Sequence, residues 1–240
     1  MYTSMIKIAK LNERPEIFYS IQGEGKNIGT PSVFIRSALC NLHCIWCDTP
    51  YTWNWGKYNK DDMILNLTPE QIVCEVKRYN CKNIVITGGE PFLQQEEFLN
   101  VIKLLRENDN RYFFEIETNG TIKPLQEFDQ YINQYNVSPK LANGGDPLEL
   151  RERPDVYEFF RNNHKAYFKF VMVNKNDLNE VIALVEKYRL SKERIFLMPE
   201  GTSDKEIGER RLWIIETCKQ LGFRYTDRLH IQLYGSKRGV

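Results

Sequence analysis

The stretch SVFIRSALCNLHCIWCDT, residues 32–49, runs from an apolar strand pattern directly into three cysteines within eight positions. Cys40, Cys44 and Cys47 have the spacing C-x3-C-x2-C. Steps of four and three residues also separate neighbours on one helix face, so a helical interpretation is open. Half of a structural zinc site is a second possibility, but such a site needs a fourth ligand, usually from another paired motif.

No second C-x2-C pair occurs in the 240 residues. Cys74 and Cys218 lie in helical patterns, and we expect both in the core because free cysteine is commonly buried. His43 lies between the clustered cysteines, where sharing one tetrahedral ion would strain the loop, so we expect it to face solvent or pack on the loop. Three thiolates leave one metal position open, and an open position is where a substrate binds.

The composition is that of an ordinary globular protein, with 42% hydrophobic and 27% charged residues. A net charge of +1 gives no electrostatic footprint of a nucleic-acid or membrane-surface partner. No apolar run approaches the roughly 18 residues of a membrane span, and MYTSMIKIAK is not a signal peptide. We therefore expect a cytoplasmic protein, in which clustered cysteines more often serve metal or redox chemistry than disulfides.

Strand patterns alternate with helix patterns along the chain. The expected strands are 32–38, 83–88, 112–118, 135–139, 167–173, 194–200 and 229–234. The expected helices are one opening at the capping box Thr68–Gln71, one over 98–105, one over 178–185, and one from the capping box Ser203–Glu206 to Gly222. This alternation predicts an α/β fold with a parallel sheet and right-handed crossovers.

Small and polar residues follow the ends of these predicted strands. They are the cysteine loop after residue 38 and the segments 87–91, 117–120, 138–140 and 198–201. The carboxyl ends of parallel strands lie along one edge of a sheet, which is where functional sites form. We therefore predict a functional site at this edge.

The cysteine loop, with aromatic Trp46 just before its last cysteine, resembles the signature of the radical S-adenosylmethionine superfamily. Gly88-Gly89-Glu90 at the end of the next strand strengthens the resemblance, although alone it could be a plain strand-to-helix turn in which Pro91 starts the helix. The resemblance implies an incomplete (β/α) barrel. It also implies a 4Fe–4S cluster on Cys40, Cys44 and Cys47, whose open iron binds S-adenosylmethionine and cleaves it to a 5′-deoxyadenosyl radical.

Two further stretches, EIFYSIQGEG (16–25) and CDTPYTW (47–53), narrow the resemblance to the 7-carboxy-7-deazaguanine synthase family of 7-deazapurine and queuosine biosynthesis. The resemblance runs from about residue 16 to the C-terminus, and it is thin between 141 and 190. It implies ring contraction of 6-carboxy-5,6,7,8-tetrahydropterin to 7-carboxy-7-deazaguanine with loss of ammonia. It further implies Mg²⁺ as a cofactor, an electron donor such as flavodoxin or ferredoxin, and a homodimer. One domain would span 1–240, with residues 1–15 as an N-terminal extension.

The resemblance also assigns site residues. The implied substrate contacts are Ile21, Gln22, Gly23, Glu24, Arg36, Thr87 and Val240. The implied S-adenosylmethionine contacts are Trp46, Cys47, Asp48, Gly89, Glu117, Ser138, Pro139, Lys140, Met198, Pro199, Glu200 and Gly201. Thr49 is the implied magnesium ligand, since a hydroxyl oxygen suits a hard cation. Arg36 offers a planar fork for the substrate carboxylate. On their own, Arg36 could be a solvated strand end and 22–25 a surface turn.

Besides the N-terminal extension, the sequence departs from the family near its C-terminus, and it leaves two alternatives. Gln232-Leu233-Tyr234 carries tyrosine where some members have histidine in a Q-x-H motif, which leaves the distal part of the substrate pocket open. The alternative enzyme is an activase that makes a glycyl radical on a partner protein. The non-enzymatic alternative is a binding module in which zinc or a cluster only stiffens a loop, which leaves the QGEG, GGEP and SPK stretches unexplained.

Overall fold

The structure, a computed structural model, describes residues 5–240. Residues 1–4, the start of the expected N-terminal extension, lie outside the described residues. The strands are β1 (Ile6–Leu11), β2 (Arg14–Pro15), β3 (Ile17–Ile21), β4 (Pro31–Ser37), β5 (Ile64–Leu67), β6 (Asn83–Gly88), β7 (Phe113–Thr118), β8 (Gln134–Val137), β9 (Ala166–Met172), β10 (Ile195–Pro199) and β11 (Arg224–Tyr225). The helices are α1 (Lys60–Met63), α2 (Pro69–Lys77), α3 (Gln95–Asn108), α4 (Gln126–Tyr131), α5 (Leu148–Arg151), α6 (Pro154–Asn162), α7 (Asp177–Tyr188), α8 (Asp204–Leu221) and α9 (Leu229–Tyr234).

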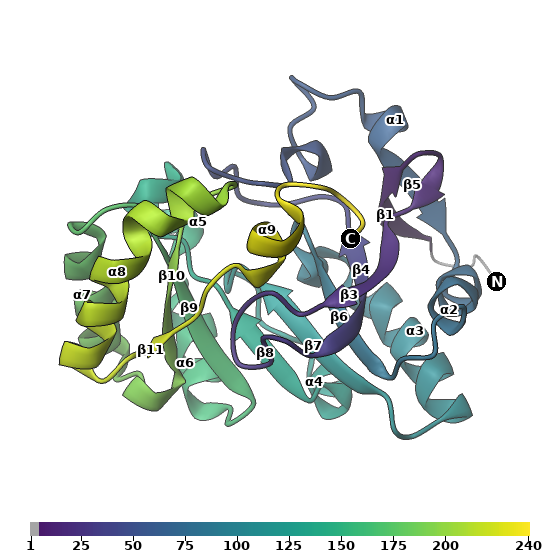
Figure 1. The fold of residues 1–240 in the computed structure, drawn as a ribbon. Helices are drawn as coiled ribbons and strands as arrows, with labels where there is room; N and C mark the ends of the chain where they lie inside the picture. The colour runs from purple at the N-terminus through teal and green to yellow at the C-terminus, as the bar shows by residue number, and fades with distance from the viewer. Residues whose placement is uncertain (1–4) are drawn as a thin grey trace.

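The strands form one open, curved sheet (Figure 1). Its order is β11-β10-β9-β8-β7-β6-β4-β1-β2, with β3 also paired to β4 and β5 to β1. Neighbours from β4 to β11 are parallel, whereas the pairs made by β1, β2, β3 and β5 are antiparallel. In the described residues β11 and β2 do not pair with each other, so the sheet does not close. This is the incomplete (β/α) barrel that the sequence predicted.

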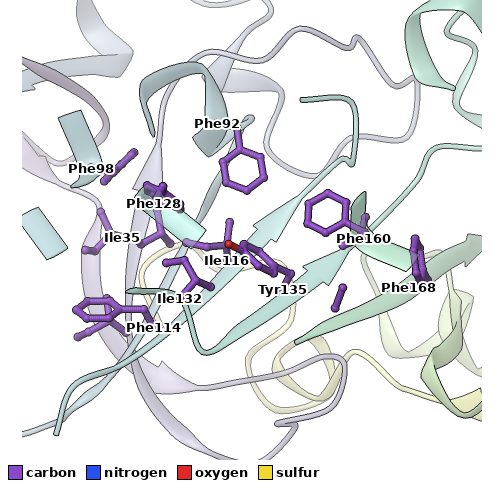
Figure 2. Packing of buried hydrophobic residues seen from close by; sticks show 14 of the residues in the cluster. Ile35, Phe92, Phe98, Phe114, Ile116, Phe128, Ile132, Tyr135, Phe160 and Phe168 are labelled. Atoms are coloured by element: carbon purple, nitrogen blue, oxygen red, sulfur yellow. The ribbon is translucent and has the colours of Figure 1, made fainter. Parts of the chain in front are cut away.

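The two faces of the sheet differ in chemistry because side chains alternate along each strand. Helices α2, α3, α4, α6, α7 and α8 lie along the outer side, while α9 and the C-terminal segment lie on the inner side (Figure 1). Outward side chains such as Ile35, Ile116 and Tyr135 are buried in one apolar core with these helices. Figure 2 shows this packing, in which the rings of Phe92 and Phe160 lie 6.2 and 5.3 Å from that of Tyr135.

Six of the seven predicted strands are confirmed within one or two residues, as β4, β6, β7, β8, β9 and β10. The prediction of a strand over 229–234 is wrong, because this segment is helix α9. LHIQLY alternates as a half-buried strand would, but only Ile231 is buried, and Leu233 and Tyr234 are 52% and 43% exposed. The alternation there does not mark a buried face.

The predicted helices are confirmed as α2, α3, α7 and α8. Both capping boxes are present, at Thr68–Gln71 and at Ser203–Glu206, and α8 ends at Gly222, whose φ of 74° is left-handed. Cys218 is buried as expected, but the prediction for Cys74 is wrong, because its side chain faces solvent from α2. None of the helices in residues 5–240 has the length and apolar character to cross a lipid bilayer.

The described part of the N-terminal extension belongs to the sheet. Residues 6–11 form β1, which pairs with β5 from Ile6 to Ala9 and meets β4 at Ile8. Ile6 and Ile8 are fully buried in the main core. A single domain over 1–240 stays a prediction, and this pairing supports it.

Two glycines join the end of β6 to the segment after β4. Gly89 N donates to Ser37 O at 3.0 Å, and Glu90 N donates to Leu39 O at 2.8 Å. A Cβ added to Gly88, whose φ is 125°, would lie 2.1 Å from Ser37 O, and one added to Gly89 would lie 1.9 Å from Leu39 O. Only glycine fits this approach of two backbones.

This close contact predicts that one methyl group added at Gly88 destabilises the fold. Gly88→Ala should lower the free energy of unfolding by about 2 kcal/mol or more, because the new Cβ meets backbone in a left-handed conformation. Gly208→Ala is the matched control, since no atom lies within 4 Å of its added Cβ, and it should raise stability by about 0.5–1 kcal/mol. Urea unfolding of both variants measures the difference, and equal stabilities would contradict the close contact.

Candidate active site

The inner face of the sheet holds a cavity of about 270 Å³ at the carboxyl ends of the parallel strands. Its wall brings together the cysteine loop, the turn after β3, several strand ends and the C-terminal segment 235–240. The sequence-predicted residues in this wall are Ile21, Gln22, Gly23, Glu24, Arg36, Cys40, Cys44, Trp46, Cys47, Asp48, Thr49, Thr87, Gly89, Glu117, Ser138, Lys140, Met198, Glu200 and Val240. Pro139, Pro199 and Gly201 lie beside the wall and do not line it.

The cysteine loop presents three free thiols to this cavity. Burial raises the pKa of Cys40 and that of Cys44 to about 12. Trp53 Nε1 donates to Cys47 Sγ at 3.3 Å, and Asn119 Nδ2 donates to Cys40 Sγ at 3.9 Å. These N–H groups favour the thiolate form that a metal ligand requires, whereas burial opposes it until a positive ion is bound.

The loop is held by the segment 143–146. Trp46 Nε1 donates to Asn143 Oδ1 at 3.1 Å, Ile45 N to Gly144 O at 2.9 Å, and His43 N to Asp146 Oδ1 at 2.8 Å. The sequence interpretation missed this support, because it comes from the region where the resemblance is thin and no residue spacing connects it to the cysteines. The residues NGGD at 143–146 are typical of a turn, and such a pattern does not indicate what the turn contacts.

The side chain of His43 is exposed and stacks on Trp53, with ring centroids 4.6 Å apart. The expectation that it packs on the loop and faces solvent is confirmed. It does not point to a metal ion shared with the cysteines.

Arg36 sits at the strand end of β4 on the same face as Phe34, and both line the cavity. Its Nε donates to Glu16 Oε1 at 3.0 Å, and its side chain is only 18% exposed. In residues 5–240 no acceptor binds its two terminal nitrogens, which leaves a fork available to a ligand. Burial alone would lower the pKa of Arg36, but Tyr51, Glu16 and Asp48 raise it, so the guanidinium stays charged.

Glu16 also ties the C-terminal segment to this end of the cavity. Its carboxylate is fully buried and accepts from Tyr51 Oη at 3.1 Å and from Arg238 Nη2 at 2.6 Å. The guanidinium of Arg238 lies 3.5 Å over the ring of Tyr51. The segment 235–240 is thereby fixed in the wall, which agrees with the placement of Val240 there.

The turn after β3 is built on buried polar contacts. Gln22 Nε2 donates to Glu115 Oε1 at 2.5 Å and to Glu117 Oε1 at 3.1 Å. Glu24 is ion-paired with Lys169 and with Arg228, whose Nε lies 3.0 Å from Oε1. Burial would raise the pKa of Glu24, but Lys169 and Arg228 hold it well below its usual range. Each carboxylate oxygen keeps a second lone pair for a ligand donor.

Glu115, Lys169 and Arg228 were missed by the sequence interpretation. Glu115 accepts from Asn136 Nδ2 at 2.5 Å as well as from Gln22, and burial raises its pKa to about 7. A usable signal existed in the sequence, because FFEIE and YFKF each carry a charged residue on the alternate face of an apolar strand. Arg228 had no such signal, since it lies just before the segment 229–234 that was predicted as a strand.

The tyrosine that departs from the family pattern lies outside the site. Tyr234 is 43% exposed and does not line the cavity, whereas His230 on the same helix does. A Cβ added to Gly23 would lie 2.1 Å from His230 Nδ1, so the glycine allows the histidine to approach the turn. The distal part of the cavity wall is therefore lined by His230 and not by Tyr234.

The other predicted side chains lie at the strand ends. Thr87 Oγ1 donates to Glu117 Oε2 at 2.7 Å, and Lys140 Nζ donates to Ser138 Oγ at 3.0 Å. Thr49 Oγ1 lies 3.7 Å from Cys47 Sγ. All of these groups face the same cavity as the thiols.

Comparison with known proteins identifies the family of this chain. The model of the radical SAM superfamily matches residues 34–189. The 7-carboxy-7-deazaguanine synthase of Pyrobaculum aerophilum is 38% identical over 231 residues, which cover 93% of this chain and 95% of that protein. The chain belongs to the 7-carboxy-7-deazaguanine synthase family.

Two further comparisons support this membership. A protein of the same name from Halobacterium salinarum is 33% identical over 91% of this chain and 89% of its own length. The crystal structure of QueE from Escherichia coli is similar with a TM-score of 0.68 at 25% identity, covering 94% of this chain and 95% of that chain.

As a radical SAM family member the protein uses a 4Fe–4S cluster and S-adenosylmethionine, and the residues at the cavity fit both. In residues 5–240 no three or more His, Cys, Asp or Glu side chains are placed to hold a single metal ion. A cubane cluster does not need such convergence, because each thiolate binds a different iron. The remaining cavity is lined by strand-end groups that include Ser138, Lys140 and Glu200, which suit a polar cofactor.

The cluster assignment predicts iron content in this family member. After anaerobic reconstitution, Cys40→Ala, Cys44→Ala and Cys47→Ala should each fall far below the about four irons per chain of a complete cluster. Cys74→Ala is the control and should keep its iron, because Cys74 is exposed on α2. Iron and sulfide analysis with visible absorption measures this, and one zinc per chain in place of iron would contradict the assignment.

Proposed function

We propose that the protein carries out the reaction of its family, the radical ring contraction of 6-carboxy-5,6,7,8-tetrahydropterin to 7-carboxy-7-deazaguanine with release of ammonia. One observation carries the proposal for this chain. A single cavity brings the three cysteine thiols together with the turn 22–25 and the fork of Arg36. These are the parts that a radical reaction on a carboxylated pterin needs side by side.

We propose the site roles as follows. Arg36 binds the substrate carboxylate through its two unoccupied terminal nitrogens, in a partly desolvated place where a bidentate pair is strong. Gln22 and Glu24, fixed by Glu115 and Lys169, face the amide and guanidine-like edge of the pterin with the backbone of Ile21 and Gly23. Thr87 and Val240, which both line the cavity, complete the substrate contacts.

The opposite part of the cavity would hold S-adenosylmethionine. Cys40, Cys44 and Cys47 would ligate the cluster, with Trp46, Asp48, Gly89, Glu117 and the strand ends 138–140 and 198–201 around the cofactor. When bound, the cluster and S-adenosylmethionine would together supply the 5′-deoxyadenosyl radical that removes the hydrogen from carbon 6 of the pterin and returns it. The protein's own part is to fix both ligands and exclude water. Thr49, at the base of the loop, would be a ligand of Mg²⁺.

The cellular setting is also part of the proposal. Free thiols at Cys40, Cys44 and Cys47 favour a reducing compartment, so we propose the cytoplasm. A flavodoxin or ferredoxin would supply the electron, and the enzyme would act as a homodimer, as the resemblance implies. The activase alternative leaves the turn 22–25 and the unoccupied fork of Arg36 in the cavity wall without a role.

The direct test of the function is product formation. The reconstituted protein with reductant, Mg²⁺, S-adenosylmethionine and 6-carboxytetrahydropterin should form 7-carboxy-7-deazaguanine, identified by its mass. The Cys47→Ala variant is the control and should form none, because the cluster requires all three thiolates. Cleavage of S-adenosylmethionine by the wild type without any deazaguanine product would contradict the proposal and favour an activase.

Arg36 provides a test of the substrate orientation. Arg36→Ala should weaken productive pterin binding about ten- to a hundredfold, the effect of one lost charged hydrogen-bond pair. Arg36→Lys should recover only part of this, since an ammonium cannot pair with both carboxylate oxygens in one plane. Arg78→Ala, an exposed residue at the C-terminal end of α2, is the control.

The measurement is product formation over a range of pterin concentrations at saturating S-adenosylmethionine. Iron content and S-adenosylmethionine binding should be nearly unchanged in both Arg36 variants, because in the described residues Arg36 is hydrogen-bonded to Glu16 and to none of the three cysteines. Wild-type kinetics in Arg36→Ala would remove this residue from the substrate site.

A further inference from the structure

Arg228 connects three separate segments through one guanidinium group. It precedes α9 and is 7% exposed. Its Nε donates to Glu24 Oε1 at 3.0 Å, its Nη1 donates to Gly201 O at 2.6 Å, and its Nη2 is paired with Asp48 Oδ2. Every nitrogen of the fork is therefore used, and each donates to a different segment in or beside the cavity wall.

The three acceptors belong to different halves of the proposed site. Glu24 lies in the turn that would face the pterin. Asp48 directly follows the last cysteine of the loop, and Gly201 follows β10, where S-adenosylmethionine would lie. Arg228 is thus a single rigid link between the substrate half and the cofactor half.

The charges explain why this link is strong. Asp48 has no other ion pair in the described residues, so Arg228 is its one charged partner there. Glu24 keeps a second partner, since Lys169 binds its other oxygen. Without Arg228, Asp48 would no longer be linked to the turn 22–25, whereas Glu24 would still be neutralised by Lys169. The position of the substrate half of the site would then no longer depend on that of the cofactor half.

We propose that Arg228 is a positioning residue that couples the two ligand sites, so that binding of either the pterin or S-adenosylmethionine strengthens binding of the other. A ligand that fixes Glu24 or Asp48 orients the planar fork, and the fork then presents the other carboxylate in place. Such coupling is reciprocal and commonly amounts to about 5–150-fold in affinity. The proposal rests on the proposed function, because the two ligands are those of that reaction.

The test measures affinities in the cluster-loaded protein without reductant, so that no turnover occurs. Anaerobic titration calorimetry gives the dissociation constant of S-adenosylmethionine with and without saturating 6-carboxytetrahydropterin, and the reverse. The wild type should show the same factor of at least about 5 in both directions. Arg228→Gln and Arg228→Lys should bring this factor close to one while each ligand alone still binds.

Two further variants separate coupling from a loss of folding. Arg211→Gln removes an arginine whose partners, Asp204 and Asp227, lie outside the cavity, and it should keep the wild-type factor. Asp48→Asn leaves Arg228 in place, removes one arm of the link, and should also lower the factor. Thermal unfolding of each variant reports its stability, which a purely structural arginine would change without changing the ratio of affinities.

Two results would overturn the proposal. One is a factor near one in the wild type, and the other is a wild-type factor that persists in folded Arg228→Gln or, where that variant does not fold, in Asp48→Asn. Both are distinguishable from failure of the proposed function, because the wild type forms 7-carboxy-7-deazaguanine in either case. A wild type that forms no such product contradicts the function and, with it, the coupling.

Discussion

The contact of two backbones after β4 and β6 is the constraint on which the site depends. Gly88 and Gly89 pack against Ser37 and Leu39 so closely that a Cβ at either glycine would lie about 2 Å from a carbonyl oxygen. The cysteine loop starts directly after Leu39, and its far side is held by Asn143 and its neighbours. In the structure the two glycines therefore fix the start of the loop that carries the thiols.

Because side chains alternate along each strand, the outer face of the sheet stabilises the fold and the inner face forms the site. The outer face is apolar and packs against the helices in one core, while the inner face carries the buried ionisable groups Glu115 and Lys169 and the half-buried Arg36. Charges at such depth are costly unless paired, and nearly all of these are paired or accept several hydrogen bonds. The cost is tolerated because the pairs hold the turn 22–25 and the strand ends in position for two ligands.

The sequence predicted the parallel strands and most of the cavity wall, because apolar runs with polar ends mark both features at once. The prediction failed where a pattern was too short, or where a residue is held by a contact with a distant part of the sequence. LHIQLY alternates over six residues and is still helix α9, and the helical position of Cys74 did not say which face it occupies. Arg228 joins Glu24 across more than 200 positions, and no local pattern reports such a pair.

The central claim is that one cavity lets a radical generated at the cysteine loop act on a pterin held by the turn 22–25 and Arg36, with its hydrogen returned at the end. The number of product molecules formed per S-adenosylmethionine measures this most directly. With limiting S-adenosylmethionine and excess reductant and pterin, the account predicts more than one 7-carboxy-7-deazaguanine per S-adenosylmethionine, with the cofactor recovered intact. Consumption of one S-adenosylmethionine for each product, or its cleavage without product, would contradict it.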